Sequence, residues 1–142
     1  MDKYSESLDL VMLVDDDDTT NYLNERLLKD MQVAKKIVVM KNGREAIDYL
    51  KTAASGTSDL KSPDLIFLDI KMPVMDGFSF LDAYQQEGLD VTDQVIILML
   101  TSSASFYDLE RLRNYKKVKK HFSKALTKHD VREIMREYFA TR

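Results

Sequence analysis

Four adjacent carboxylates, Asp15 to Asp18, follow an apolar run in the stretch LVDDDD. Like charges placed side by side repel one another unless water or a cation lies between them. One interpretation is a solvated turn that leads into a helix, and the other is a cation site. Taken alone, such a run is more typical of a turn, so the choice depends on which other polar groups the chain brings to the same place.

Three further polar residues each follow a short apolar run. Asp69 follows LIFL, Thr101 follows VIILML, and Lys124 follows HFS. Oxygen ligands without histidine or cysteine favour Mg²⁺, with Mn²⁺ as a possible replacement. A lysine and a hydroxyl supply the positive charge and the donor that a phosphoryl group needs. An aspartate beside the ion can act as a nucleophile and form an aspartyl phosphate.

The apolar runs predict the strands that would bring these residues together. They are rich in Val, Ile and Leu, and the stronger ones lack polar alternation, which is typical of strands buried on both faces of a parallel sheet. The predicted strands are Leu10–Val14, Ile37–Met40, Leu65–Leu68, Val95–Leu100 and, more weakly, Val118–Phe122.

Helical patterns separate these strands and follow the last one. The apolar positions that mark the five helices are Leu23, Leu27 and Met31; Ala46, Ile47 and Leu50; Phe78, Leu81 and Tyr84; Phe106, Leu109 and Leu112; and Val131, Ile134, Met135, Tyr138 and Phe139. Thr127 or Asp130 is expected to cap the last helix. Thr52–Pro63 is predicted to be a mobile loop before the third strand.

Five repeats of strand and helix predict an α/β fold, a single doubly wound (βα)5 domain with a five-stranded parallel sheet. Ligands bind such sheets outside the carboxyl ends of the strands. We therefore expect Asp15, Asp16, Asp69, Thr101 and Lys124 to converge on one rim. The two remaining carboxylates of the run, Asp17 and Asp18, are interpreted as a solvated turn and the N-cap of the first helix.

The composition limits the classes of protein that need to be considered. A chain of 142 residues suggests one domain over residues 1–142, with a core of about residues 8–139 and no output domain. The net charge of −3 gives no reason to expect direct DNA binding. The absence of cysteine excludes disulfides and thiol catalysis. No apolar run is long enough to span a membrane, and a cytoplasmic protein is expected.

The combination of motifs resembles the receiver domain of two-component response regulators, a family with a flavodoxin-like, CheY-like fold. The matching stretches are LVDDD, VVMKNGREAIDYL, LIFLDIKMPVMDG, LMLTS and HFSKAL, in this order and at suitable separations. The resemblance extends from about Leu8 to about Phe139. It implies a signalling domain, and not an enzyme, that accepts a phosphoryl group from a sensor histidine kinase or a histidine phosphotransfer protein. Its output is then a conformational switch read by a downstream protein target, with the chain a monomer or a weak homodimer.

The resemblance also implies a role for each matching residue. Asp69 would accept the phosphoryl group, Asp16 would bind Mg²⁺ directly, and Asp15 would complete the acidic pair, through water. Lys71 would offer its backbone carbonyl to the metal. Thr101 would donate a hydrogen bond to the phosphoryl group and Lys124 would form an ion pair with it. Met72–Pro73 and Asp76–Gly77 would shape the loop after Asp69, where Gly77 is expected to adopt a positive φ.

Two positions depart from the family pattern. Ala125 replaces the usual proline after the rim lysine, so the Lys124–Ala125 bond is either trans with a shifted loop or cis. His121 stands where an aromatic switch residue is common, either as that switch or as an ordinary strand residue. These departures support one alternative, a pseudo-receiver adaptor that binds partners without phosphorylation. A phosphohydrolase is disfavoured because Lys71 stands where such enzymes carry a second aspartate.

Overall fold

Five parallel strands form one sheet in the computed structural model, which describes residues 7–89, 94–102 and 105–140. The strands lie in the order β2-β1-β3-β4-β5, and each neighbouring pair is parallel. Their bounds are β1 Leu8–Val14, β2 Ala34–Met40, β3 Leu65–Leu68, β4 Ile96–Thr101 and β5 Val118–Ser123. The predicted doubly wound (βα)5 fold is confirmed, and the predicted strand ends are within three residues of those observed.

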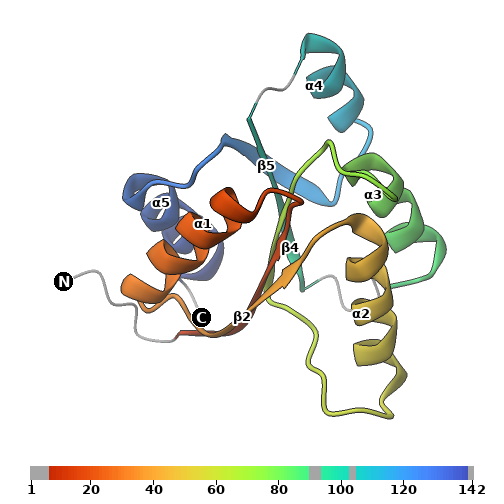
Figure 1. Ribbon diagram of the computed structural model, residues 1–142, viewed down its shortest axis with the longest axis horizontal. Coiled ribbons are helices and arrows are strands. Elements are labelled where there is room, and N and C mark those ends of the chain that lie inside the picture. Colours follow the sequence, from red (N-terminus) through yellow and green to blue (C-terminus); the bar gives the residue numbers. More distant parts are fainter. Residues whose placement is uncertain (1–6, 90–93, 103–104, 141–142) are drawn as a thin grey trace.

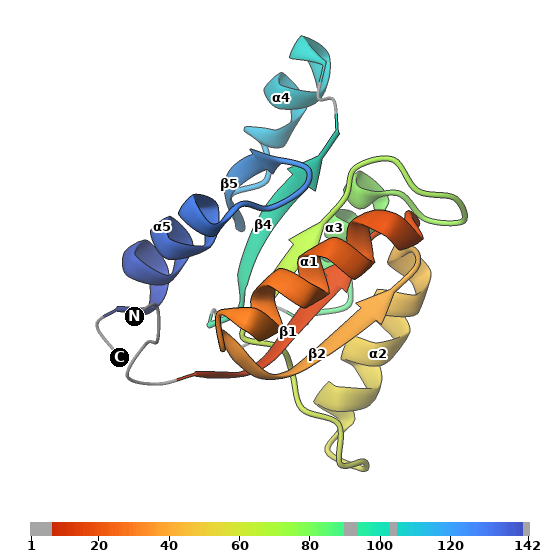
Figure 2. The same ribbon diagram turned by 60° about the vertical axis from the view of Figure 1, so that its left-hand side comes forward.

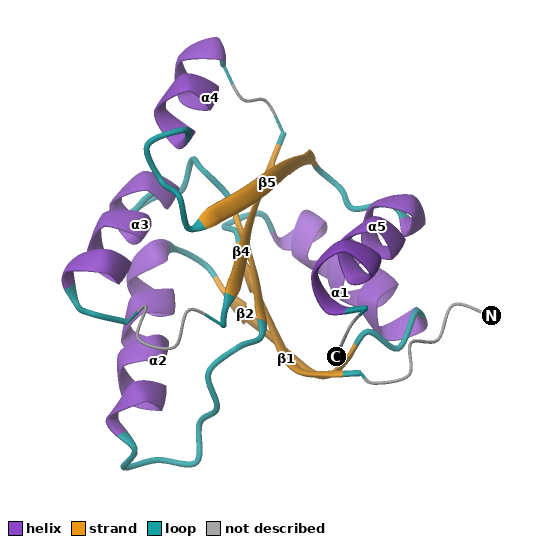
Figure 3. Cartoon of the chain, turned by 180° about the vertical axis from the view of Figure 1, so that it is seen from behind, coloured by secondary structure: helices purple, strands orange, loops and turns teal. Residues whose placement is uncertain are grey.

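Helices cover both faces of this sheet (Figures 1 and 2). Their bounds are α1 Asp18–Asp30, α2 Gly43–Ser55, α3 Gly77–Gln86, α4 Phe106–Leu112 and α5 Lys128–Phe139. Seen from behind, α1 and α5 lie together on one side of the strands, with α2 and α3 on the other (Figure 3). In the part of the chain that is described, no helix is long and apolar enough to cross a membrane.

The hydrophobic core is divided in two by the sheet. Successive residues of β1 point to opposite faces, as the pleat of a strand requires. Val11 and Leu13 pack in the cluster that includes α1 and α5, whereas Met12 and Val14 pack in the cluster with α2, α3 and Leu112. Because β1 is buried on both faces, the chain that follows it is held firmly at the end of the sheet.

Two predictions about the helices are wrong in detail. Thr52–Ser55 belongs to α2 and not to a loop, and the hydroxyls of Thr52 and Ser55 bond back to helix carbonyls at 3.0 and 2.7 Å. Gly56 then ends the helix with φ of +75°. On α1, Leu23 is 48% exposed, whereas Met31 is buried and Leu27 is partly buried, as predicted. The prediction missed four buried residues of the helix, Thr20, Asn21, Asn24 and Leu28.

The other helices bury the predicted faces. Ala46, Ile47 and Leu50 of α2 are buried, as are the apolar positions that marked α3. On α4, Leu112 is buried, while the side chain of Phe106 lies outside the described residues. Thr127 is the N-cap of α5 and forms a capping box with Asp130, so both predicted capping residues take part.

Candidate functional site

The carboxyl ends of four neighbouring strands bring the predicted residues to one edge of the sheet. Asp15 follows β1, Asp69 follows β3, Thr101 is the last residue of β4, and Lys124 follows β5. Backbone hydrogen bonds extend the pairing past the strand ends: Asp69 N–H donates to the Val14 carbonyl at 2.9 Å, and Lys124 N–H donates to the Thr101 carbonyl at 3.1 Å. The backbone that carries the site residues is therefore held in place by the sheet.

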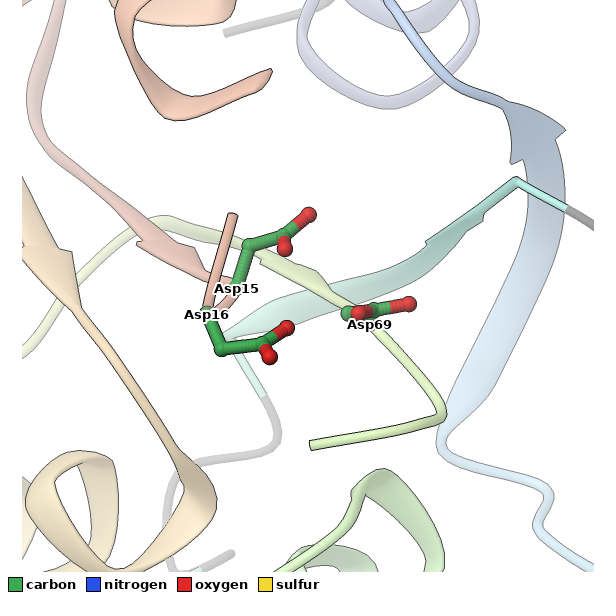
Figure 4. Close-up of side chains that lie close together, drawn as sticks. All are labelled: Asp15, Asp16 and Asp69. Atoms are coloured by element: carbon green, nitrogen blue, oxygen red, sulfur yellow. The ribbon is translucent and has the colours of Figure 1, made fainter. Parts of the chain in front are cut away.

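Three carboxylates form an acidic cluster at this edge (Figure 4). One oxygen each from Asp15, Asp16 and Asp69 lies within 4.8 Å of the others. Asp15 and Asp69 are each 4% exposed, whereas Asp16 is exposed. Bringing carboxylates this close is unfavourable without a cation, and an all-oxygen ligand set suits Mg²⁺. The cluster therefore fits a hard divalent ion.

Lys124 places an ammonium group between the two buried carboxylates. Its Nζ lies 2.9 Å from Asp15 Oδ2 and 3.2 Å from Asp69 Oδ2. Burial opposes the charge of the lysine, but the hydrogen bond to Asp15 and the attraction of Asp69 outweigh it and raise the pKa of Lys124. The ammonium is therefore held in its charged form, next to carboxylate oxygens of Asp15 and Asp69.

Asp69 is the carboxyl of this cluster whose titration is most clearly perturbed. Burial, reinforced by the negative charge of Asp15, raises the pKa of Asp69 to about 6, although Lys124 opposes the shift. Its Oδ1 accepts a hydrogen bond from the Ile70 N–H at 2.9 Å, while Oδ2 faces Lys124. Strong perturbation by burial and by a specific charge is typical of functional carboxylates.

An open cleft of about 500 Å³ gives access to this cluster from solvent. Thr101 is nearly buried and lies in its wall, so the cleft joins the hydroxyl to the lysine and the carboxylates, as the sequence predicted. The residues that line it are Asp16, Asp17, Thr20, Leu23, Asp69, Lys71, Thr101, Ser102, Lys124 and Ala125. Lys71 is in this set, and the metal contact of its backbone carbonyl stays a prediction.

The two other carboxylates of the opening run shape the turn into α1. Asp17, and not Asp18 as predicted, is the N-cap, and its side chain accepts hydrogen bonds from the backbone N–H and the hydroxyl of Thr20. The hydroxyl of Thr20 is the main cause of the lowered pKa of Asp17. Asp18 is the first helical residue and forms an ion pair with Lys41. The backbone N–H of Asp17 also donates to Asp15 Oδ1 at 2.9 Å, which fixes that carboxylate.

Gly77 is needed in the loop after Asp69 for a different reason from the one predicted. Positive φ values among the described glycines occur at Gly56 and Gly88, and not at Gly77. A Cβ on Gly77 would lie 2.5 Å from the backbone oxygen of Asp69, and its N–H donates to the Ile70 carbonyl at 2.7 Å. Glycine therefore allows the start of α3 to pack directly against the backbone of Asp69.

The structure shows the conformation of the Lys124–Ala125 bond and the location of His121, the two departures from the family pattern. The Lys124–Ala125 peptide bond is cis, and Lys124 still reaches the acidic cluster. His121 is exposed on β5 and lines a groove beside α4, together with Leu109 and Leu112. A switching role for His121 stays a prediction.

Two asparagines of α1 that were not predicted contact the backbone of the site. Asn21 Nδ2 donates to the carbonyl of Asp15 at 2.9 Å, and Asn24 Oδ1 accepts from the N–H of Leu126 at 3.0 Å. The available signal was their spacing of three residues, which places them on the same helix face as Leu28.

The sequence matches the response regulator receiver domain over residues 11–136, and the chain belongs to that family. The receiver is a signalling domain of two-component systems, and the acidic cluster fits its phosphorylation site.

Similar proteins cover nearly all of the chain. A two-component response regulator from Cytophaga hutchinsonii has a TM-score of 0.82 at 26% identity, covering 94% of this chain and 98% of its own. A probable methanogenesis regulatory protein, FilR2, of Methanothrix harundinacea is 25% identical over 90% of this chain and 79% of its own length. The receiver domain of the histidine kinase CKI1 from Arabidopsis thaliana, solved with Mg²⁺, has a TM-score of 0.76 at 20% identity, covering 91% of this chain and 90% of its own.

Proposed function

We propose that the chain accepts a phosphoryl group on Asp69 from a phosphohistidine of a sensor histidine kinase or a histidine phosphotransfer protein. The observation that carries this proposal is the position of Asp69. Its carboxylate is buried against Lys124, lies within reach of two further carboxylates, and opens to solvent through the cleft. An Asp69 oxygen attacks the phosphorus atom, the phosphorus–nitrogen bond breaks, and the imidazole leaves with the bonding electron pair.

The charges of the site support a role for Mg²⁺, with Mn²⁺ as a substitute. Three carboxylates against one ammonium leave two negative charges, which a divalent cation balances. We propose Asp16 and Asp69 as direct ligands, Asp15 as a ligand through water, and the carbonyl of Lys71 as a further oxygen. The receiver domain of CKI1, which was solved with Mg²⁺, shares the fold. The ion supplies neutralisation of the incoming phosphoryl oxygens.

Thr101 and Lys124 are proposed to bind the phosphoryl group once Asp69 is phosphorylated. Both line the cleft that holds Asp69, and the backbone N–H of Lys124 is already bonded to the carbonyl of Thr101. A hydroxyl hydrogen bond and an ammonium ion pair to the phosphoryl oxygens would favour the switched conformation. A downstream protein, which we expect in the cytoplasm, then recognises that conformation, and the chain acts as a monomer or a weak homodimer without contacting DNA directly.

Intact-protein mass spectrometry after incubation with acetyl phosphate or phosphoramidate tests this function. We expect the wild type to gain one phosphoryl group in the presence of Mg²⁺ and none when the ion is chelated. Asp69→Asn should gain none, whereas Asp59→Asn, which removes an exposed carboxylate away from the site, should behave as the wild type. Folded wild type that gains no phosphoryl group from either donor would contradict the proposal and favour the adaptor function.

A further inference from the structure

The buried side of helix α1 carries two asparagines beside the core residues Leu28 and Met31, at positions where apolar residues would be expected. Asn24 is 1% exposed and Asn21 is 5% exposed, and both lie on the same face as the core residue Leu28. Burying an amide costs free energy unless its hydrogen bonds are replaced. A structural reason for these two residues must therefore be sought in what they bind.

Both asparagines bind backbone groups of the acidic site. Asn21 donates to the carbonyl of Asp15, and Asn24 accepts from the N–H of Leu126, two residues after Lys124. The second bond joins residues that are 102 positions apart in the sequence. Helix α1 therefore touches the segment after β1 and the segment after β5, which carry the two members of the Asp15–Lys124 ion pair.

The segment after β5 is held at two backbone points. At one, Lys124 N–H donates to Thr101 of β4, and at the other, Leu126 N–H donates to Asn24 of α1. Ala125, which lies between them, has no ring to fix its own φ, as a proline would have. Besides the packing of the Leu126 side chain in the core cluster that includes α1, the hydrogen bond to Asn24 is thus the directional contact with α1 that orients the chain directly after Lys124.

We propose that Asn24 is a positioning residue for Lys124. By accepting the Leu126 N–H, Asn24 fixes the segment after β5 relative to α1, and this places Lys124 Nζ between the carboxylates of Asp15 and Asp69. The effect of Asn24 on phosphoryl transfer rests on the function proposed above. If the lysine is displaced, its ammonium group no longer contacts the incoming phosphoryl oxygens. The position of the lysine itself does not depend on that function.

The first experiment measures that position directly, by the rate at which an amine-reactive acetylating reagent modifies Lys124. Peptide mass mapping gives this rate relative to Lys51, whose side chain is 49% exposed. In the wild type, Lys124 is only 12% exposed and is paired twice, so it should react slowly. Asn24→Leu removes the acceptor at similar volume, and Asn24→Ser provides a smaller variant whose hydroxyl is too short to reach Leu126.

We expect both Asn24 variants to increase the relative acetylation rate of Lys124 several-fold. Leu28→Ala is the matched control, because it destabilises the same face of α1 but leaves the hydrogen bonds of Asn21 and Asn24 to the site in place. An increase in Leu28→Ala equal to that in the Asn24 variants, at matched stability in urea, would overturn the proposal. So would an unchanged rate in Asn24→Ser, which keeps the proposal testable if Asn24→Leu does not fold.

The second experiment asks whether Asn24 affects phosphorylation through Lys124. At saturating Mg²⁺, Asn24→Leu should lower the maximal rate of phosphorylation by acetyl phosphate roughly tenfold or more, as a small misplacement of a charged group does. In a Lys124→Ala background the same substitution should change nothing further. Equal effects in both backgrounds would refute action through the lysine. A wild type that is never phosphorylated contradicts the proposed function, while the acetylation rates still decide the role of Asn24.

Discussion

Replacing Asp69 by asparagine is expected to stabilise the metal-free protein at neutral pH. Burial and the charge of Asp15 raise the pKa of this carboxyl to about 6, against 3.8 for an unperturbed aspartate. The folded chain therefore binds a proton on Asp69 more tightly than the unfolded chain does. As the pH rises from 3.8 to about 6, Asp69 loses its proton in the unfolded chain before it does so in the folded chain, and the free energy of unfolding falls. A difference of about 2 pH units, at about 1.4 kcal/mol each, corresponds to about 3 kcal/mol.

The stabilisation by Asp69→Asn depends on pH, because only the wild-type carboxyl titrates. Below 3.8 the Asp69 carboxyl is protonated in both the folded and the unfolded chain, so asparagine brings no electrostatic advantage. As the pH rises from 3.8 to about 6, the wild type loses stability relative to Asp69→Asn, and above this window the difference stays constant. The stabilisation by asparagine is therefore a property of neutral and alkaline pH.

Urea denaturation in the presence of a chelator measures this difference. We expect Asp69→Asn to exceed the wild type by about 3 kcal/mol at pH 7.5 and by little at pH 4. Asp59→Asn makes the same change in net charge at an exposed position and should leave the free energy of unfolding nearly unchanged. An Asp69→Asn variant that is no more stable than the wild type at pH 7.5, or that gains equally at both pH values, would refute the reasoning.

Three further substitutions and one ligand test the same geometry. Mg²⁺ at a hundred times its Kd should raise the free energy of unfolding of the wild type by about 2.7 kcal/mol, and that of Asp69→Asn by much less, in urea titrations. Lys124→Met removes the ammonium beside Asp15 and Asp69, so the pKa of Asp69 should rise further and the metal-free variant should be less stable at pH 7.5; an unchanged midpoint in urea would argue against the pair. Gly77→Ala forces a Cβ to within 2.5 Å of the Asp69 backbone oxygen and should cost about 1–3 kcal/mol while slowing phosphorylation; wild-type values for both would show that the contact relaxes freely. Thr127→Ala removes the N-cap of α5 and should cost about 1 kcal/mol in thermal unfolding without changing the phosphorylation rate.

The strands and the positions of the site residues were predictable because they depend on local chemistry. Runs such as LIFL are apolar on both faces and have the length of a buried strand, so β3 was placed correctly at both ends. Asp69 then follows the strand, and parallel pairing brings it beside Asp15 without further information. A pattern of two-sided burial was thus sufficient to assemble the acidic cluster.

The errors occur where a contact with the backbone, and not apolar packing, characterises the residue. Thr52 and Ser55 look like loop residues, but they lie in the last turn of α2, where their hydroxyls bond back to helix carbonyls. Gly77 looked like a turn glycine, yet it is needed because the backbone of Asp69 lies against it. Neither contact leaves a periodic signal in the sequence, since each depends on one specific partner.

The buried face of α1 shows why the candidate site was only partly predictable. The apolar pattern correctly selected Met31, but it also selected Leu23, which is half exposed, and it missed the buried Asn21 and Asn24. Local and tertiary requirements conflict at this helix, and such conflicts are expected near functional sites. The side chains that hold the Asp15 and Leu126 backbones are polar because they must bond to the chain beneath them. A helix whose hydrophobic pattern fails on its inner face is therefore a place to look for residues that position a site.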